Sequence, residues 1–144
     1  MASTHVAHDC LVGDNVIMSN LATLGGHVQI GNWSILGGGV LVHQFTQIGE
    51  HSLIGGGFRA VQDVPPFIIA ANHPLEYKGV NIVGLKRRGF SKKDIDLIKK
   101  VYRWFFRSGG NRKTAIEKIE SESPKTKVIQ KILDFIKYSN RGII

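Results

Sequence analysis

Residues 21–50 read LATLGGHVQI GNWSILGGGV LVHQFTQIGE, and a large aliphatic residue recurs in this stretch at nearly every sixth position. The series extends in both directions and is apolar at ten consecutive steps: Val6, Val12, Met18, Leu24, Ile30, Leu36, Val42, Ile48, Ile54 and Ala60. A small residue, most often glycine, follows eight of these ten anchors, where we expect it to relieve awkward backbone angles at a corner. A repeat of this length predicts a parallel β-helix.

The expected architecture is a prism with three short strands and 18 residues in each coil, stacked by parallel pairing. A second inward series stands four residues after each anchor and is mostly small or β-branched, as at Val16, Val28 and Val40. The alternative is a glycine-rich β-sandwich with accidental spacing. An unbroken register over about 60 residues favours the β-helix. Handedness does not follow from the repeat, because right-handed crossovers are the general rule.

An 18-residue coil stacks residues that are 18 apart, so His8 lies below Gly26 and Asp9 below His27. One longitudinal strip then collects six residues that are far apart in sequence: His8, Asp9, Gly26, His27, His43 and Gln44. Two other interpretations are an inert solvated surface and a metal site, since imidazole is a common zinc ligand. The strip offers a line of rings rather than a point of convergence, so we expect no metal. His51 lies off the strip and is expected at the surface.

The strip suits acyl transfer to a hydroxyl group. A histidine such as His8 can accept a proton at neutral pH, and the adjacent Gly26 can bring a backbone N–H to a developing oxyanion. Asp9 could orient His8. Successive side chains of a strand point to opposite faces, so Asp9 helps only if the dipeptide occupies a corner.

The second half of the chain differs in composition. Residues 1–70 hold one basic and four acidic residues, whereas residues 71–144 hold 18 basic and seven acidic residues, which is a net charge of −3 against +11. We predict that the β-helix covers residues 1–70, followed by a connecting basic loop over 71–90, extended at 79–90, and a small helical domain over 91–144. Its helices are expected from Ser91 to Gly109-Gly110, over 113–120, and from Ser123-Pro124 onward. The fold class is therefore a β-helix plus α-helices.

Bulk properties narrow the function classes. No apolar run approaches the ~20 residues of a membrane span, and the amino terminus does not resemble a signal peptide. The single cysteine, Cys10, excludes an internal disulfide, fits a reducing cytoplasm, and is more typical of a buried small residue than of a nucleophile. Lys86-Arg87-Arg88 needs an anionic partner. No recognised nucleic-acid motif is present, and arginine between glycines suits phosphate recognition.

Five motifs together closely resemble the acyl-[acyl-carrier-protein]–UDP-N-acetylglucosamine O-acyltransferase family, which begins lipid A biosynthesis in Gram-negative bacteria. They are His5-Val6-Ala7-His8-Asp9-Cys10, Leu24-Gly25-Gly26-His27, Val42-His43-Gln44-Phe45, Gln62-Asp63-Val64-Pro65-Pro66, and residues 79–90 with Gly84-Leu85-Lys86-Arg87-Arg88-Gly89-Phe90. The resemblance covers essentially the whole chain. Two of the motifs, His-Gln-Phe and Gly-Leu-Lys-Arg-Arg-Gly-Phe, separate this family from hexapeptide acetyltransferases in general.

The resemblance implies a left-handed β-helix and a cytoplasmic homotrimer with active sites between subunits. It implies that His8 is the general base, that the Gly26 N–H stabilises the oxyanion, and that Gly56 limits acyl length. The sugar-nucleotide site would be lined by His5, His27, His43 and Gln44, with Asn81 and Arg87 reaching the nucleotide and Arg88 supporting them. The substrates would be UDP-N-acetylglucosamine and a 3-hydroxyacyl group on acyl carrier protein. The carrier's phosphopantetheine arm serves as co-substrate, with no other cofactor, and the basic half suits docking of this acidic protein.

Two features depart from the family. Its members carry several more coils before the His-Val-Ala-His-Asp segment, and Val83 stands where an acidic residue is expected near the nucleotide. We therefore expect a fragment or a truncated relative. The alternative function is a non-catalytic module of the same fold that trimerises or binds the carrier protein. The sequence leaves open the acyl length and whether the acceptor is a 3-hydroxyl or a 3-amino group.

Overall fold

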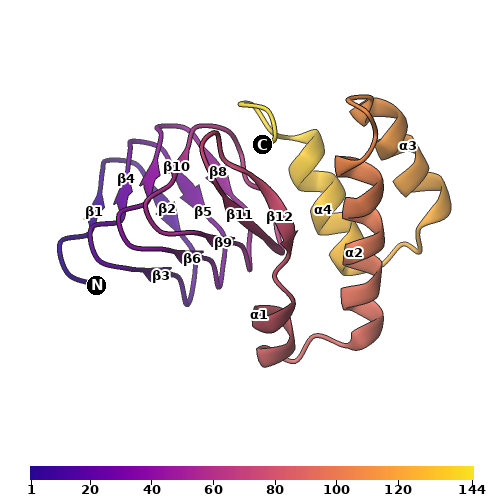
Figure 1. The fold of residues 1–144 in the computed structure, drawn as a ribbon, viewed down its shortest axis with the longest axis horizontal. Helices are drawn as coiled ribbons and strands as arrows, with labels where there is room; N and C mark the ends of the chain where they lie inside the picture. Colours follow the sequence, from indigo (N-terminus) through magenta and orange to yellow (C-terminus); the bar gives the residue numbers. More distant parts are fainter.

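The computed structural model describes residues 1–144 as a β-helix followed by four α-helices (Figure 1). The strands are β1 (His5–Val6), β2 (Leu11–Val12), β3 (Ile17–Met18), β4 (Thr23–Leu24), β5 (Gln29–Ile30), β6 (Ile35–Leu36), β7 (Leu41–Val42), β8 (Gln47–Ile48), β9 (Leu53–Ile54), β10 (Arg59–Ala60), β11 (Ile68–Ala71) and β12 (Glu76–Val80). The helices are α1 (Ile82–Arg87), α2 (Lys92–Phe106), α3 (Arg112–Glu122) and α4 (Lys127–Lys137).

Three sheets form the sides of the prism. Sheet 1 has the order β1-β4-β7-β10, sheet 2 has β2-β5-β8, and sheet 3 has β3-β6-β9-β11-β12. The strands of successive coils are parallel and 18 residues apart, as in the pairs His5↔Thr23 and Thr23↔Leu41. The coil is a left-handed parallel β-helix, which confirms the predicted fold class.

Three corners connect the sheets. The first corner, between sheets 1 and 2, contains residues 7–10, 25–28 and 43–46. The second corner, between sheets 2 and 3, contains residues 13–16, 31–34 and 49–52. The third corner, between sheets 3 and 1, contains residues 19–22, 37–40 and 55–58. Residues that share a corner are therefore stacked along one edge of the prism.

The aliphatic anchors fill the interior of the prism. Leu24, Leu36 and Ile54 have no exposed surface, whereas Val6 is 48% and Val12 is 43% exposed in the first coil. The difference arises because β1, β2 and β3 each pair with a strand on one side only. The first coil thus presents an open end with free backbone groups and apolar side chains.

The glycines after the anchors have a different purpose from the one predicted. Left-handed backbone angles occur two residues further on, for example at Asp9 (φ 60°), His27 (φ 59°) and Phe45 (φ 64°). A Cβ at Gly25 would lie only 2.7 Å from the backbone nitrogen of Gln44 in the next coil. These glycines are required by the close approach of stacked coils, not by their own torsion angles.

The segment after Pro65-Pro66 also differs from the prediction. We expected the β-helix to end at residue 70 and residues 79–90 to be an extended loop. Instead β11 adds to β9, β12 pairs antiparallel with β11, and α1 follows. The β11 register shortens the coil by two residues, since Ile69 pairs with Leu53. The loop prediction is wrong because Val80 and Leu85 are buried and stabilise ordered structure there.

The helices pack at the end of the β-helix opposite the amino terminus (Figure 1). Ser91 caps α2, with its hydroxyl accepting a hydrogen bond from Asp94 N at 3.1 Å, as predicted. The hydroxyl of Tyr102 in α2 donates to the carbonyl of Pro66 at 2.5 Å and joins the helices to the last coil. The final helix begins later than predicted, at Lys127, because Thr126 provides the cap. None of the four helices has the length and apolarity that a membrane span requires.

Candidate functional site

The predicted strip lies along the first corner. The backbone ladder continues through this corner, since His27 N donates to His8 O and Phe45 N donates to Gly26 O, both at 3.0 Å. The rings of His8 and His27 meet edge to face at 5.1 Å, and His27 stacks on Phe45 at 4.7 Å. The structure therefore brings together the predicted residues of three successive coils.

His8 and Asp9 form a hydrogen-bonded pair, with His8 Nδ1 3.0 Å from Asp9 Oδ2. This hydrogen bond, followed by the charge of His27, lowers the pKa of the Asp9 carboxyl. An ionised carboxylate can only accept, so His8 Nδ1 carries the proton and the lone pair of the neutral ring is on Nε2. The arrangement leaves His8 Nε2 able to take a proton from a bound hydroxyl.

Gly26 lies directly against the His8 ring. A Cβ at this position would be 2.8 Å from His8 Nε2 and 2.8 Å from Cε1, so only glycine leaves room for the imidazole. The Gly26 N–H has no acceptor within the protein, while its carbonyl accepts from Phe45 N. A base and a free backbone donor thus stand side by side at the corner.

Three other predicted residues surround this pair. His5 on β1 and His43 and Gln44 on the first corner are exposed. None of the three side chains has a hydrogen-bond partner within the protein. Their polar atoms are available to a ligand on the same edge of the prism.

The side-chain atoms of His8, Asp9 and His27 that could bind a metal ion lie closer together than the sequence led us to expect. One ligand atom from each lies within 4.8 Å of the others, and His27 Nε2 is 3.7 Å from Asp9 Oδ2. The left-handed conformation of Asp9 turns its carboxylate toward both rings. The line of rings assumed for the strip is therefore incorrect at this point. All three residues are exposed, and the shortest of these approaches is the hydrogen bond between His8 Nδ1 and Asp9 Oδ2.

The predicted nucleotide residues lie elsewhere, at the second corner. Arg87 and Arg88 belong to α1 and its end, and they line a cleft of about 960 Å³ together with Trp33, His51 and Phe90. Arg87 is exposed and has no partner in the protein, whereas the Arg88 guanidinium stands 5.4 Å above the Trp33 ring. The cleft combines arginine and aromatic groups, which suits a nucleoside diphosphate.

Asn81 is a structural residue of this cleft. It is buried, its Oδ1 accepts from Gly84 N at 3.3 Å, and its Nδ2 donates to His51 O at 3.0 Å. Both polar atoms therefore hold the start of α1 in place. Val83, where an acidic residue was expected, is 61% exposed at the cleft.

Sequence reasoning missed His51, which was expected at the surface and is only 8% exposed. It contacts Arg88, with 3.2 Å between His51 Nδ1 and Arg88 Nη1, and stacks with Trp33 at a ring distance of 6.4 Å. The spacing of 18 residues between Trp33 and His51 is the one signal in the sequence that places them on the same edge.

Gly56, the predicted acyl-length residue, lies at the third corner. A Cβ there would be 3.2 Å from the Gly38 carbonyl oxygen of the coil below. The predicted residues are thus divided among three different edges of one chain. Within one copy of the chain, these residues do not form a single site.

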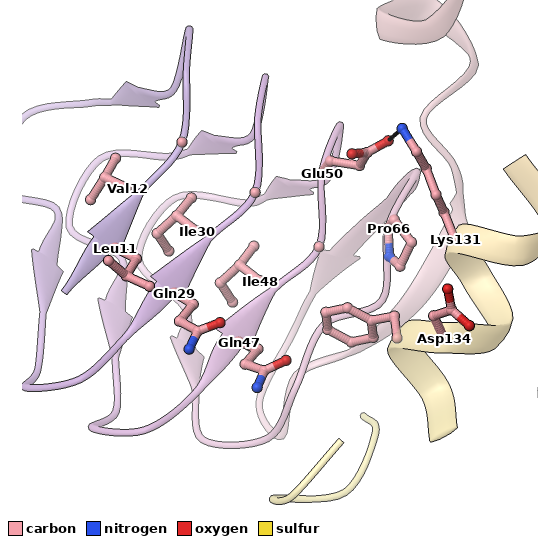
Figure 2. A pocket seen from close by; sticks show the side chains of 14 residues that line it. Leu11, Val12, Gln29, Ile30, Gln47, Ile48, Glu50, Pro66, Lys131 and Asp134 are labelled. Atoms are coloured by element: carbon pink, nitrogen blue, oxygen red, sulfur yellow. Dashed lines mark hydrogen bonds and ion pairs between the residues drawn. The ribbon is translucent and has the colours of Figure 1, made fainter. Parts of the chain in front are cut away.

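A further groove of about 460 Å³ follows sheet 2 and reaches α4 (Figure 2). Gln29 and Gln47 lie side by side on adjacent strands, and Lys131 of α4 reaches Glu50 with an ion pair of 2.9 Å. None of the predicted site residues lines this groove. It is the seam between the β-helix and the last helix.

Comparison with known proteins points to one family. Residues 63–144 match the family profile described as UDP-N-acetylglucosamine O-acyltransferase, domain 2. The chain is 46% identical over 142 residues to an acyl-[acyl-carrier-protein]–UDP-N-acetylglucosamine O-acyltransferase of Aliivibrio salmonicida, and 42% identical over 144 residues to that of Thiobacillus denitrificans. These matches cover 99% and 100% of this chain but 54% and 56% of the relatives, so the chain spans about half their length.

The solved structures agree with the sequence matches. A UDP-N-acetylglucosamine acyltransferase from Bacteroides fragilis superposes with a TM-score of 0.96 at 44% identity. The match covers 99% of this chain and 56% of the Bacteroides chain. An acyltransferase of the same kind from Arabidopsis superposes with a TM-score of 0.92 at 32% identity. The likeness extends over the β-helix and the helices together.

Proposed function

Because this chain belongs to the UDP-N-acetylglucosamine O-acyltransferase family, we propose that it carries the chemistry of acyl transfer to UDP-N-acetylglucosamine. A 3-hydroxyacyl group moves from acyl carrier protein to the glucosamine 3-hydroxyl, which is the first step of lipid A biosynthesis. The observation that carries the proposal is the contact of His8 with Asp9 on one side and Gly26 on the other.

The general base is His8. Asp9 holds the proton on Nδ1, so Nε2 accepts the proton of the 3-hydroxyl while its oxygen attacks the thioester carbon. The C–S bond then breaks, and the departing thiolate of the phosphopantetheine arm takes the proton back from the His8 imidazolium. The proton returns to the leaving group, so the protein is unchanged after each transfer.

The oxyanion of the tetrahedral intermediate is stabilised by the Gly26 N–H. This donor has no acceptor in the protein and belongs to the residue against which the His8 ring packs, so it can serve the carbonyl oxygen of a thioester bound beside the base. No additional cofactor is needed for this step, because the thioester itself supplies the activated acyl group.

The sugar nucleotide is bound by two sets of groups. His5, His27, His43 and Gln44 contact the sugar near the base, and Arg87 with Arg88 binds the diphosphate. Asn81 contributes by holding α1. Gly56 at the third corner leaves room for the acyl chain.

The active protein is a homotrimer with sites between copies. The base and the arginines are on different corners of one chain, so a site that needs both is completed by the corner of a neighbouring copy. The basic helical half, with exposed Lys100 and Arg103 on α2 and Arg107 at its C-cap, suits an acidic carrier protein as partner.

A second candidate function is a non-catalytic module that trimerises or binds the carrier protein. The exposed Lys100 and Arg103 of α2 favour it, because they suit an acidic partner whether or not acyl transfer takes place.

The two candidates are separated by a chimera. The chain is placed behind the preceding coils of the Bacteroides fragilis relative, and transfer from 3-hydroxyacyl carrier protein to labelled UDP-N-acetylglucosamine is measured. We expect transfer by the chimera, and a loss on the order of a hundred- to ten-thousandfold with His8→Ala. A folded chimera without activity, or one that keeps full activity with His8→Ala, would contradict the catalytic proposal.

Mixed trimers of two inactive variants test whether the site lies between copies of the chain. Chimeras with His8→Ala and with Arg87→Ala are each expected to be impaired, whereas trimers reassembled from both contain sites that have His8 and Arg87 intact. Recovery of part of the activity supports shared sites. Absence of any recovery in proven mixed trimers indicates sites within one copy.

A further inference from the structure

His51 lies at the second corner, between β8 and β9, among aromatic rings. Its imidazole is 5.8 Å from the Phe67 ring and 4.9 Å from the Phe90 ring, and only 8% of the residue is exposed. Burial lowers the pKa of His51 to about 4, so the ring is neutral at neutral pH. A neutral ring beside an arginine is suited to accept one hydrogen bond.

His51 contacts both ends of α1. At the start of the helix, the capping residue Asn81 donates from Nδ2 to the His51 carbonyl at 3.0 Å. At the end, the C-cap residue Arg88 lies with Nη1 3.2 Å from His51 Nδ1. A guanidinium only donates, so His51 Nδ1 accepts and the ring proton is on Nε2.

The Arg88 side chain is fixed from a second direction. Its guanidinium stands 5.4 Å from the centre of the Trp33 ring, and this ring is nearly parallel to His51, with an angle of 11°. Arg87 precedes it on the same short helix and points its charge to solvent without a partner. The orientation of α1 therefore decides where both arginines lie.

We propose that His51 is a positioning residue, which clamps both ends of α1 and so orients Arg87 and Arg88 toward a bound diphosphate. His51 itself does not contact the ligand. The step from orientation to diphosphate binding rests on the function proposed above, whereas the clamp does not.

Two variants of the same position separate the clamp from simple packing. His51→Asn keeps an acceptor close to the place of Nδ1, and asparagine tolerates the left-handed angle of this residue, φ 56°. His51→Leu removes the acceptor but keeps an apolar side chain. Leucine is accommodated at the equivalent corner position of Leu21, where φ is 67°.

The affinity for UDP is measured by calorimetry with the unmodified chain and both variants. We expect His51→Leu to weaken binding by about tenfold, and His51→Asn to stay within about threefold of the unmodified chain. Hydrogen exchange of the α1 amides should accelerate in His51→Leu and not in His51→Asn. Equal UDP affinity and exchange in both variants would show that the acceptor is irrelevant and would overturn the proposal.

The tautomer of His51 gives a readout that is independent of any ligand. Long-range proton–nitrogen spectra of the ¹⁵N-labelled chain at pH 7 should show a bare Nδ1 and a protonated Nε2. A charged ring or the opposite tautomer contradicts the clamp. If the unmodified chain binds no UDP while the tautomer and exchange results hold, the clamp stands and the proposed nucleotide site is what fails.

Discussion

His8 Nδ1 lies 3.0 Å from Asp9 Oδ2, although the two residues are consecutive in sequence. In a strand their side chains would point to opposite faces. The contact exists because Asp9 adopts φ 60° at the first corner, which folds its carboxylate back beside the preceding ring. The corner thus turns a dipeptide into a base with its own orienting group.

Asp9→Asn should slow transfer by about tenfold while leaving the fold intact. Asparagine tolerates the corner angle, as Asn15 does at φ 58° in the same coil. Its amide cannot replace the carboxylate that holds the proton on Nδ1, so less of His8 has a free Nε2. Initial rates of the chimera measure the effect. An unchanged kcat would show that Asp9 does not orient the base.

Gly26→Ala should reduce transfer by about a hundredfold, because its Cβ would be 2.8 Å from the His8 ring and would displace the base. Gly38→Ala is the matched control. Gly38 holds the equivalent position at the third corner, where the nearest atom to a Cβ is Asn20 O at 3.5 Å. Kinetics and thermal unfolding are compared for both. If both variants lose activity equally, the effect belongs to the corner and not to His8.

Much of the first corner could be predicted from the sequence, because an 18-residue period fixes which residues stack. The period identified His8, Gly26 and Gln44 on one edge, and the backbone ladder follows that register. It could not give the direction of the Asp9 carboxylate, which depends on a single left-handed residue.

The second corner was much less predictable. α1 has six residues, which is too short for a helical pattern to be recognised. Its two capping residues, Asn81 and Arg88, both contact His51, which lies 30 and 37 positions before them. The role of His51 depends on these long-range contacts. The series of anchors ends at Ala60, so it did not predict that the last coil is two residues shorter.

Arg87 and Arg88 should differ in their effect on stability. Arg87→Ala should weaken UDP binding by about tenfold without a change in the free energy of unfolding, since its side chain has no partner in the protein. Arg88→Ala should weaken binding and also destabilise the fold by about 1–2 kcal/mol, because it leaves His51 Nδ1 without a donor. Calorimetry and urea unfolding of the two variants measure these effects. Equal stability of both would contradict the contact between Arg88 and His51.

The stability of the chain should depend on His51 between pH 6.5 and pH 4. Its pKa falls from 6.5 to about 4 on folding, chiefly because burial disfavours the charged ring, so the unfolded chain binds more protons in this window. The contribution of His51 is fully present above pH 6.5 and is lost as the pH falls toward 4, by about 2 kcal/mol. His51→Asn cannot titrate, so its unfolding free energy should fall less over the same range. Urea unfolding at pH 7, 5.5 and 4.5 measures both proteins. Parallel curves would mean that folding leaves the pKa of His51 unchanged, which would contradict a buried ring held neutral beside Arg88.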